Sequence, residues 1–239
     1  MSAVETDAEP QDDLARLREE LGQIHLAQVA HRRRAIILLE GPDCAGKKFA
    51  LRQLVAAFDP CHVGVHNVNS DRREQCEGHW LSRFWRDLPA GGHTSLFYRS
   101  WYRRVLNDRL SGKIEGAALA RTFDEINEFE AQQRDYGTLI VKLYFDVSPD
   151  VQERRIVEYF ANPWHRRFPH EEGMRVNHPG YADALAELKE QSNMRWSPWH
   201  VINGDDEPAA AARALSIVID AWRKAMPAEP PRLVDTKVA

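Results

Sequence analysis

The residues best suited to chemistry stand together in one short segment between positions 41 and 48. Two glycines, Gly41 and Gly46, are separated by four residues and followed by Lys47. Glycines at this spacing let the backbone curl so that successive N–H groups face one anion, and the start of a following helix adds partial positive charge. The Lys47 ammonium would reach the same oxygens. The candidate phosphate-binding residues are Gly41, Pro42, Asp43, Cys44, Ala45, Gly46, Lys47 and Lys48.

Asp43 is the candidate metal ligand of this segment. Its carboxylate would stand close to a bound phosphate, and the two negative charges repel each other unless a cation lies between them. Position 48 holds lysine, whereas comparable nucleotide-binding loops carry a serine or threonine whose hydroxyl helps to hold Mg²⁺. We therefore predict that Asp43 organises Mg²⁺, with Mn²⁺ as the alternative ion. The other interpretation is that Asp43 only stabilises a turn.

The flanking segments indicate a strand before this loop and a helix after it. Residues 35–41 form a short apolar run, typical of a strand buried on both faces of a parallel sheet, and residues 47–58 have helical character. Further strands are predicted at 62–68, 95–98, 138–147 and 199–204, and further helices at 13–30, 72–87, 101–110, 116–136, 149–161, 181–194 and 207–226. Strands that alternate with helices predict an α/β fold with a mainly parallel sheet. This context favours phosphate binding over the alternative, a glycine-rich turn without a ligand.

The chain is expected to form one domain over residues 13–226, with an acidic tail at 1–12 and a proline-rich tail at 227–239. Both tails are predicted to be disordered because they hold few apolar residues to bury. Residues 162–180 are polar, rich in histidine and arginine, and interrupted by prolines. We expect this stretch and its neighbours, about 150–195, to form a lid.

Composition excludes several classes of protein. The formal net charge of −4 over 239 residues argues against a general nucleic-acid binder, while basic clusters at 31–34, 99–104 and 165–167 suggest a local site for a polyanion. The chain has no apolar run near the roughly 18 residues that span a bilayer, so no membrane partner is expected. The 3 cysteines lack metal-binding spacing and favour a reducing cytoplasm. Cys44 would start a helix, a position that can lower a thiol pKa, but no other feature suggests redox chemistry.

Several motifs follow one another in the order known from one protein family. The loop has the form G-x-D-x-x-G-K, and a Leu-x-Arg-Phe segment, a Leu-Pro pair and the phrase RSWYxR come after it. The matching residues are Gly41, Asp43, Gly46, Lys47, Leu81, Arg83, Phe84, Leu88, Pro89, Phe97, 99–102 and Arg104, and similarity continues at 129–130, 152–155, 162–163, Tyr181 and 197–199. In this order the chain resembles the family-2 polyphosphate kinases over about residues 15–225.

The resemblance implies a P-loop kinase-like α/β fold, a parallel sheet flanked by helices, with a helical lid. It implies an enzyme that uses Mg²⁺ to move phosphate between inorganic polyphosphate and a nucleoside mono- or diphosphate, and we expect a homo-oligomer. Arg99 and Arg104 would line the phosphate channel, and Arg83 would help to position the nucleotide. The residues implied to be catalytic are Asp43, Lys47, Arg99 and Arg104. Those implied to bind substrate beyond the loop are Arg83, Arg109, Arg154, Arg155, Arg166 and Arg167, of which the last four belong to the lid.

Position 98 departs from the family's phrase. The family has an aspartate there, at the end of a strand, where it serves metal and phosphate, whereas the Tyr98 phenol, with an ordinary pKa of about 10, is uncharged at neutral pH. Asp71, Glu74 and Glu77 are the neighbouring acids that could substitute. The alternative function is therefore a catalytically weak or silent module that binds polyphosphate or nucleotide. A third hypothesis, a nucleoside monophosphate kinase that uses ATP, predicts Ser or Thr at position 48 and no RSWY phrase, and both expectations fail.

Overall fold

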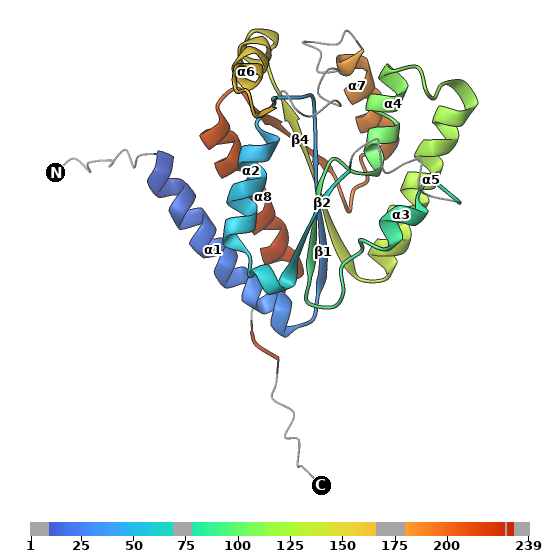
Figure 1. The fold of residues 1–239 in the computed structure, drawn as a ribbon. Coiled ribbons are helices and arrows are strands. Elements are labelled where there is room, and N and C mark those ends of the chain that lie inside the picture. Colours follow the sequence, from blue (N-terminus) through green and yellow to red (C-terminus); the bar gives the residue numbers. More distant parts are fainter. Residues whose placement is uncertain (1–9, 69–77, 166–179, 228, 232–239) are drawn as a thin grey trace, which may run out of the picture.

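A parallel β-sheet forms the centre of the computed structural model, which describes residues 10–68, 78–165, 180–227 and 229–231 (Figure 1). The strands are β1 (Arg34–Glu40), β2 (Val63–Asn67), β3 (Thr94–Tyr98), β4 (Thr138–Asp146) and β5 (Trp199–Asn203). Over the described ranges they pair in the order β2-β3-β1-β4-β5, and all these pairs are parallel. The predicted α/β class and parallel sheet are thus confirmed.

Helices cover both faces of the sheet (Figure 1). The helices on one face are α1 (Pro10–Ala30), α2 (Lys47–Ala57) and α8 (Glu207–Ala225). Those on the other face are α3 (Ser82–Trp85), α4 (Asn107–Leu110), α5 (Gly116–Asp135) and α7 (Tyr181–Ser192). Helix α6 (Pro149–Ala161) projects beyond the carboxyl end of β4.

The side chains of β1 explain why its sequence is continuously apolar. Ile37 and Leu39 belong to the core formed with α1, α2 and α8, whereas Ile36 and Leu38 belong to the core formed with α5 and α7. Successive side chains of a strand point to opposite faces, so a strand covered on both faces buries every residue. The central strand therefore holds the loop that follows it on a rigid base.

Two of the predicted helices are wrong in part. Of the helix expected at 72–87, residues 72–77 lie outside the described ranges, 78–81 form a bend and a turn, and only α3 is helical. Gly78 has a φ of 129°, a conformation that glycine adopts readily and that does not continue a helix. The helix expected at 101–110 is a 3-10 helix, η3 (Trp101–Arg104), followed by the separate α4. Leu106 separates them, with φ −100° and ψ −84°.

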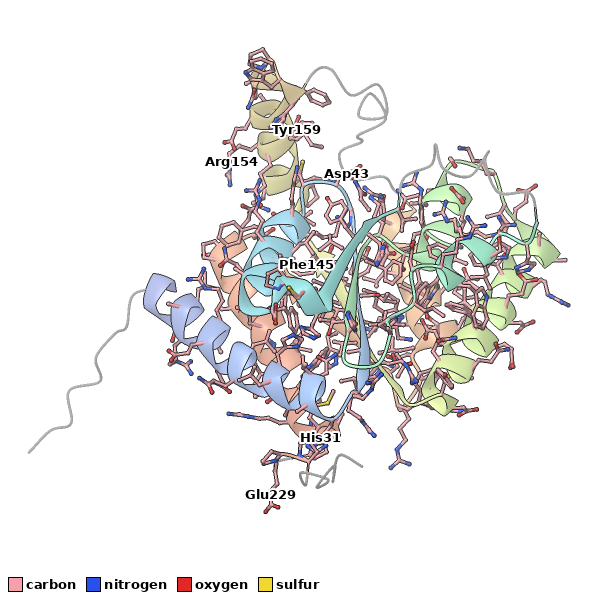
Figure 2. The ribbon with its side chains drawn as sticks, turned by 60° about the horizontal axis from the view of Figure 1, so that its bottom comes forward. His31, Asp43, Phe145, Arg154, Tyr159 and Glu229 are labelled. Carbon is pink, nitrogen blue, oxygen red and sulfur yellow. The ribbon has the colours of Figure 1, made fainter. Side chains whose placement is uncertain are left out.

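The ends of the domain differ slightly from the expected bounds. Helix α1 begins at Pro10 rather than at residue 13. After α8, the carbonyl oxygen of Glu229 accepts a hydrogen bond of 2.6 Å from His31 Nε2, so this part of the expected tail lies against the end of α1 (Figure 2). In the described part of the chain, no helix is both long and apolar enough to cross a membrane.

Candidate active site

The loop 41–46 connects the carboxyl end of β1 to α2. Gly41 has a φ of 130°, and a Cβ placed on it would lie 2.1 Å from the carbonyl oxygen of Phe145 in β4. Only glycine therefore lets the chain leave the sheet at this point. Gly46 has a φ of 83° and precedes the first turn of α2. The predicted strand–loop–helix context is present, with the unpaired N–H groups of the helix start next to the loop.

Lys47 folds back against the loop that precedes it. Its side chain is buried, and Nζ donates to the carbonyl oxygen of Gly41 at 2.8 Å and to that of Pro42. Burial, with repulsion from Arg99, lowers the pKa of Lys47 to about 8. The ammonium group is thus mostly charged at neutral pH and fixed at the loop.

Asp43 and Arg99 meet although 56 residues separate them in the sequence. Arg99 follows β3, the neighbour of β1, and its Nη2 pairs with Asp43 Oδ1 while its Nη1 donates to Asn107 Oδ1 at 3.0 Å. Its backbone lies in the left-handed region with a φ of 61°. Because the two parallel strands end at the same edge, the guanidinium reaches the loop directly.

Glu40, the last residue of β1, holds the turn that carries Arg99. Its Oε1 accepts hydrogen bonds from the backbone N–H and the hydroxyl of Ser100, both at 2.7 Å. The carboxyl is buried, and this burial raises its pKa, against the lowering effect of the Ser100 hydroxyl. Sequence reasoning missed Glu40, although an acid at the end of an apolar strand was a visible signal.

Side chains of helix α6 donate hydrogen bonds to the loop 41–46. Gln152 donates to the carbonyl oxygen of Asp43 at 2.9 Å. Arg155 Nη1 donates to the carbonyl oxygen of Cys44 at 3.0 Å, and the same guanidinium donates at 2.7 Å to two carbonyl oxygens at 204–205, between β5 and α8. Arg155 was expected to bind substrate, but in this structure its hydrogen bonds are to protein carbonyls.

A cavity of about 790 Å³ opens above the loop, between the ends of β2 and β3, η3, α4 and α6. Figure 2 shows Asp43 at this end of the molecule, beside α6 with its labelled Arg154 and Tyr159. The charged residues lining the cavity are Asp43, Lys47, Lys48, Arg99, Arg103, Asp108, Lys113, Arg155, Glu158 and Glu207. A volume of this order suits a small-molecule ligand, and six cationic against four acidic side chains suit an anion.

A model of the family described as polyphosphate kinase 2 matches residues 4–230 of the chain. The chain belongs to the polyphosphate kinase 2 family. Among the family's solved structures, the polyphosphate kinase 2 from Arthrobacter aurescens TC1 superposes with a TM-score of 0.85 and 25% identity, covering 98% of this chain and 88% of that one. The putative polyphosphate kinase 2 from Pseudomonas aeruginosa superposes with a TM-score of 0.83 and 27% identity, covering 94% of this chain and 49% of that one.

Several proteins that are similar in sequence are named as phosphotransferases. The polyphosphate:AMP phosphotransferase of Pseudomonas aeruginosa is 31% identical over 188 residues, which are 78% of this chain and 38% of that protein. The protein of the same name from Pseudomonas syringae is also 31% identical, over 80% of this chain and 39% of its own length. The ADP-polyphosphate phosphotransferase 2 of Rhizobium meliloti is 27% identical, over 84% of this chain and 67% of its own length. The chain thus spans less than half the length of the two Pseudomonas proteins.

Some arginines expected from the polyphosphate kinase 2 resemblance lie away from the cavity lining. Arg104 stacks over the Trp80 ring at 5.0 Å, and its Nε lies 3.4 Å from the Thr122 hydroxyl of α5. Arg109 pairs with Glu187 of α7. These arginines join the helices on one side of the sheet in this conformation.

The other expected arginines are more scattered. Arg83 lies on α3, over the Phe84 ring at 4.7 Å. Arg154 is exposed on α6 (Figure 2). Arg166 and Arg167 lie outside the described residues. Of the arginines expected in the site, the described cavity wall therefore contains Arg99 and Arg155.

Arg103 lines the cavity, whereas sequence reasoning had selected its neighbour Arg104 for this role. Both belong to η3, and successive residues of a 3-10 helix point about 120° apart, so only one of two adjacent side chains faces a given direction. The sequence predicts one helix over 101–110, whereas the structure has η3 and the separate α4. The choice between two adjacent arginines therefore needed the actual backbone.

Tyr98 occupies the cavity wall at the end of β3, with its ring centre 5.9 Å from Lys47 Nζ. Burial raises its pKa, so the phenol stays neutral at physiological pH. The acids suggested as substitutes, Asp71, Glu74 and Glu77, lie outside the described residues. The wall instead presents other acids that sequence reasoning missed, namely Asp108, Glu158 and Glu207.

Cys44 also lines the cavity, with a φ of 58°. Burial raises the pKa of its thiol to about 11, and nearby Asp43 adds to the effect. The thiol is therefore protonated at neutral pH, and the lowered pKa suggested by its place at a helix start is wrong.

Proposed function

We propose that the chain transfers phosphate between inorganic polyphosphate and a nucleoside mono- or diphosphate. The observation that carries the proposal is the convergence of Lys47, Arg99 and Asp43 at the loop, at the base of a cavity with excess positive charge. Membership of the polyphosphate kinase 2 family supports it, as do relatives named for transfer to AMP or ADP. The names of these relatives favour transfer over the silent binding module.

The reaction requires one oxygen–phosphorus bond to form as another breaks. In the direction of nucleotide synthesis, a terminal phosphate oxygen of the nucleotide attacks the terminal phosphorus of polyphosphate. The bridging P–O bond breaks, and the shortened chain leaves with the electron pair on its oxygen. Lys47, Arg99 and the loop N–H groups would hold the phosphoryl oxygens in line and offset the charge that develops on them.

Mg²⁺ fits the donor set of the cavity. In sites of this kind Mg²⁺ is bound by one or two carboxylates together with substrate phosphates and water. Asp43 provides such a carboxylate, although its Oδ1 is paired with Arg99 and that pair would have to open. Within the described ranges, no cluster of three acidic, histidine or cysteine side chains could hold a metal by itself. Bound Mg²⁺ would neutralise phosphoryl charge.

Two further expectations belong to this proposal. A cytoplasmic location agrees with three cysteines that lack a pairing pattern. A homo-oligomer follows from the family resemblance.

Turnover of polyphosphate with Mg²⁺ and a panel of nucleoside mono- and diphosphates tests the function. We expect new nucleotide di- or triphosphate, detected by chromatography, and a loss of at least about a hundredfold in Lys47→Ala, because this variant removes the cation fixed at the loop. Lys47→Arg, which keeps the charge, should retain more activity. Binding of polyphosphate without turnover for every nucleotide would favour the silent module. Equal turnover by wild type and a folded Lys47→Ala would remove the loop from the mechanism.

A further inference from the structure

Most of the arginines and the buried lysine of the cavity wall already make ion pairs or hydrogen bonds with other groups of the protein. Lys47 donates to two loop carbonyls. Arg99 pairs with Asp43 and donates to Asn107. Arg155 donates to three carbonyl oxygens of the surrounding loops. A ligand must compete with these contacts before it can use the same donors.

Arg103 is the exception among them. Its guanidinium lines the cavity, its Nε is buried without a hydrogen-bond partner, and its side chain has no ion pair within the described part of the chain. Burial lowers its pKa, and repulsion from Arg99 adds to this effect, against the attraction of Glu40 and Asp43. Lys48 and Lys113 also line the cavity, but both are exposed and water can solvate them.

The backbone holds Arg103 in place independently of any ligand. Its N–H donates to the carbonyl oxygen of Ser100 at 3.1 Å, and the Ser100 side chain caps the same 3-10 helix. The two preceding residues, Trp101 and Tyr102, are completely buried. The side chain is therefore presented from a rigid base, so little ordering entropy would be lost when it binds a ligand.

A partly buried cation without a direct ion pair costs free energy, because the attraction of nearby Glu40 and Asp43 does not offset the hydration that burial removes. A phosphate group arriving in the cavity would supply that charge. The planar guanidinium fork can donate two parallel hydrogen bonds to phosphate oxygens, which an ammonium group cannot do.

We propose that Arg103 binds a phosphate group of the substrate, as the guanidinium that the described cavity wall leaves open for an anion. The proposal rests on the proposed function and adds a specific binding residue to it. The phosphate belongs either to the polyphosphate chain or to the nucleotide. Both present the same oxygens, so the two sources are separated by experiment.

The test compares Arg103→Met, Arg103→Lys and a surface control, Arg16→Met, whose side chain is 63% exposed on α1. Dissociation constants for tripolyphosphate and for ADP are measured separately by calorimetry, and melting temperatures are measured with and without each ligand. Arg103→Met should melt no lower than wild type without ligand, because it removes an unpaired cation. It should bind one of the two ligands about tenfold to a hundredfold more weakly, the range expected for charged hydrogen bonds.

The pattern of loss identifies the source of the phosphate. Weaker binding of tripolyphosphate alone places Arg103 on the chain, and weaker binding of ADP alone places it on the nucleotide. Arg103→Lys should fall between wild type and Arg103→Met, and Arg16→Met should match wild type. Unchanged affinity of Arg103→Met for both ligands overturns the inference, whatever its melting temperature. If wild type binds neither ligand, the proposed function fails and this inference fails with it.

Discussion

Side chains at the loop after β1 hold one another in a chain of contacts that ends at the loop itself. Glu40 fixes Ser100, the adjoining Arg99 reaches Asp43, and Lys47 binds the carbonyls of the loop itself. Arg99 and Asp43 neutralise each other, whereas the charged groups of Glu40 and Lys47 are held by hydrogen bonds to neutral groups. Such a site is sensitive to single changes of charge, because removing one partner leaves the other without compensation.

Tyr98 gives the clearest prediction for a single residue. Tyr98→Asp should raise turnover about tenfold, equivalent to roughly 1.4 kcal/mol of barrier, because it adds a carboxylate near Lys47 on the cavity wall. The gain should require Mg²⁺ or Mn²⁺. It is measured as kcat with saturating polyphosphate and nucleotide.

Tyr98→Asn is the matched control, since it has the size of aspartate without its charge. The same increase in Tyr98→Asn would attribute the effect to lost bulk rather than to a metal or phosphate partner. A decrease in Tyr98→Asp, starting from a fast wild type, would mean that another acid of the wall, such as Asp108 or Glu207, already serves that role.

Among the elements, α6 determines how firmly the loop is held. The helix was expected to act on substrate from a lid, yet its Gln152 and Arg155 donate to carbonyl oxygens of the loop and of residues 204–205. The two residues are three positions apart and so share one face of the helix. Helix α6 therefore joins the loop after β1 to the loop after β5.

Arg155→Gln should loosen this connection. We expect the free energy of unfolding to fall by about 2 kcal/mol, because charged hydrogen bonds to three carbonyl oxygens are lost. Amide hydrogen exchange at residues 43–46 should become faster. Arg154→Gln on the exposed side of α6 is the control and should change the free energy of unfolding by less than about 0.5 kcal/mol. Equal effects of both substitutions would contradict a specific anchoring role for Arg155.

Over the whole molecule, a chain of net charge −4 carries an excess of cations in one cavity. Affinity for tripolyphosphate should therefore fall steeply with salt, by about tenfold between roughly 50 and 200 mM NaCl, since several cations release counterions from the ligand. Titrations at the two ionic strengths measure this. An affinity that does not depend on salt would place the polyanion away from these cations.

Stability should depend on pH through a histidine cluster outside the cavity. His25 of α1 is buried among Asp59, His62 and His93, and its Nδ1 lies 3.1 Å from Gln28 Oε1. Burial lowers the pKa of His25 below its ordinary 6.5, so near that pH the unfolded chain binds a proton that the native protein does not. The contribution to stability is therefore complete above pH 6.5 and is lost as the pH falls below it.

Chemical denaturation at pH 7 and pH 5.5 tests this sign for wild type and His25→Asn. The asparagine amide can replace the Nδ1–H donor without titrating. We expect the free energy of unfolding of wild type to fall more between the two pH values than that of the variant. An equal fall in both proteins would assign the pH dependence to groups other than His25.

Local sequence was sufficient for the loop and for the parallel sheet. The apolar run of β1 predicted a strand buried on both faces, and Gly41, Gly46 and Lys47 predicted a phosphate-binding loop at its end. These features can be read from neighbours within a few residues, because the pattern of apolar residues and the conformational freedom of glycine are properties of the local sequence. The resemblance to one family added the expected arginines from the order of the motifs.

Tertiary structure decided which charged side chains meet. The Asp43–Arg99 pair joins adjacent strands, and Arg155 donates to backbone carbonyls whose positions no spacing rule gives. Whether Arg103 or Arg104 faces the cavity depended on the short 3-10 helix η3, where one longer helix over 101–110 was predicted. Small differences in backbone angles change which of two adjacent side chains faces the cavity. The packing of the buried Trp101 and Tyr102 selects these angles. The sequence by itself therefore determined the loop and its supporting sheet, and the packed molecule determined which cations line the cavity.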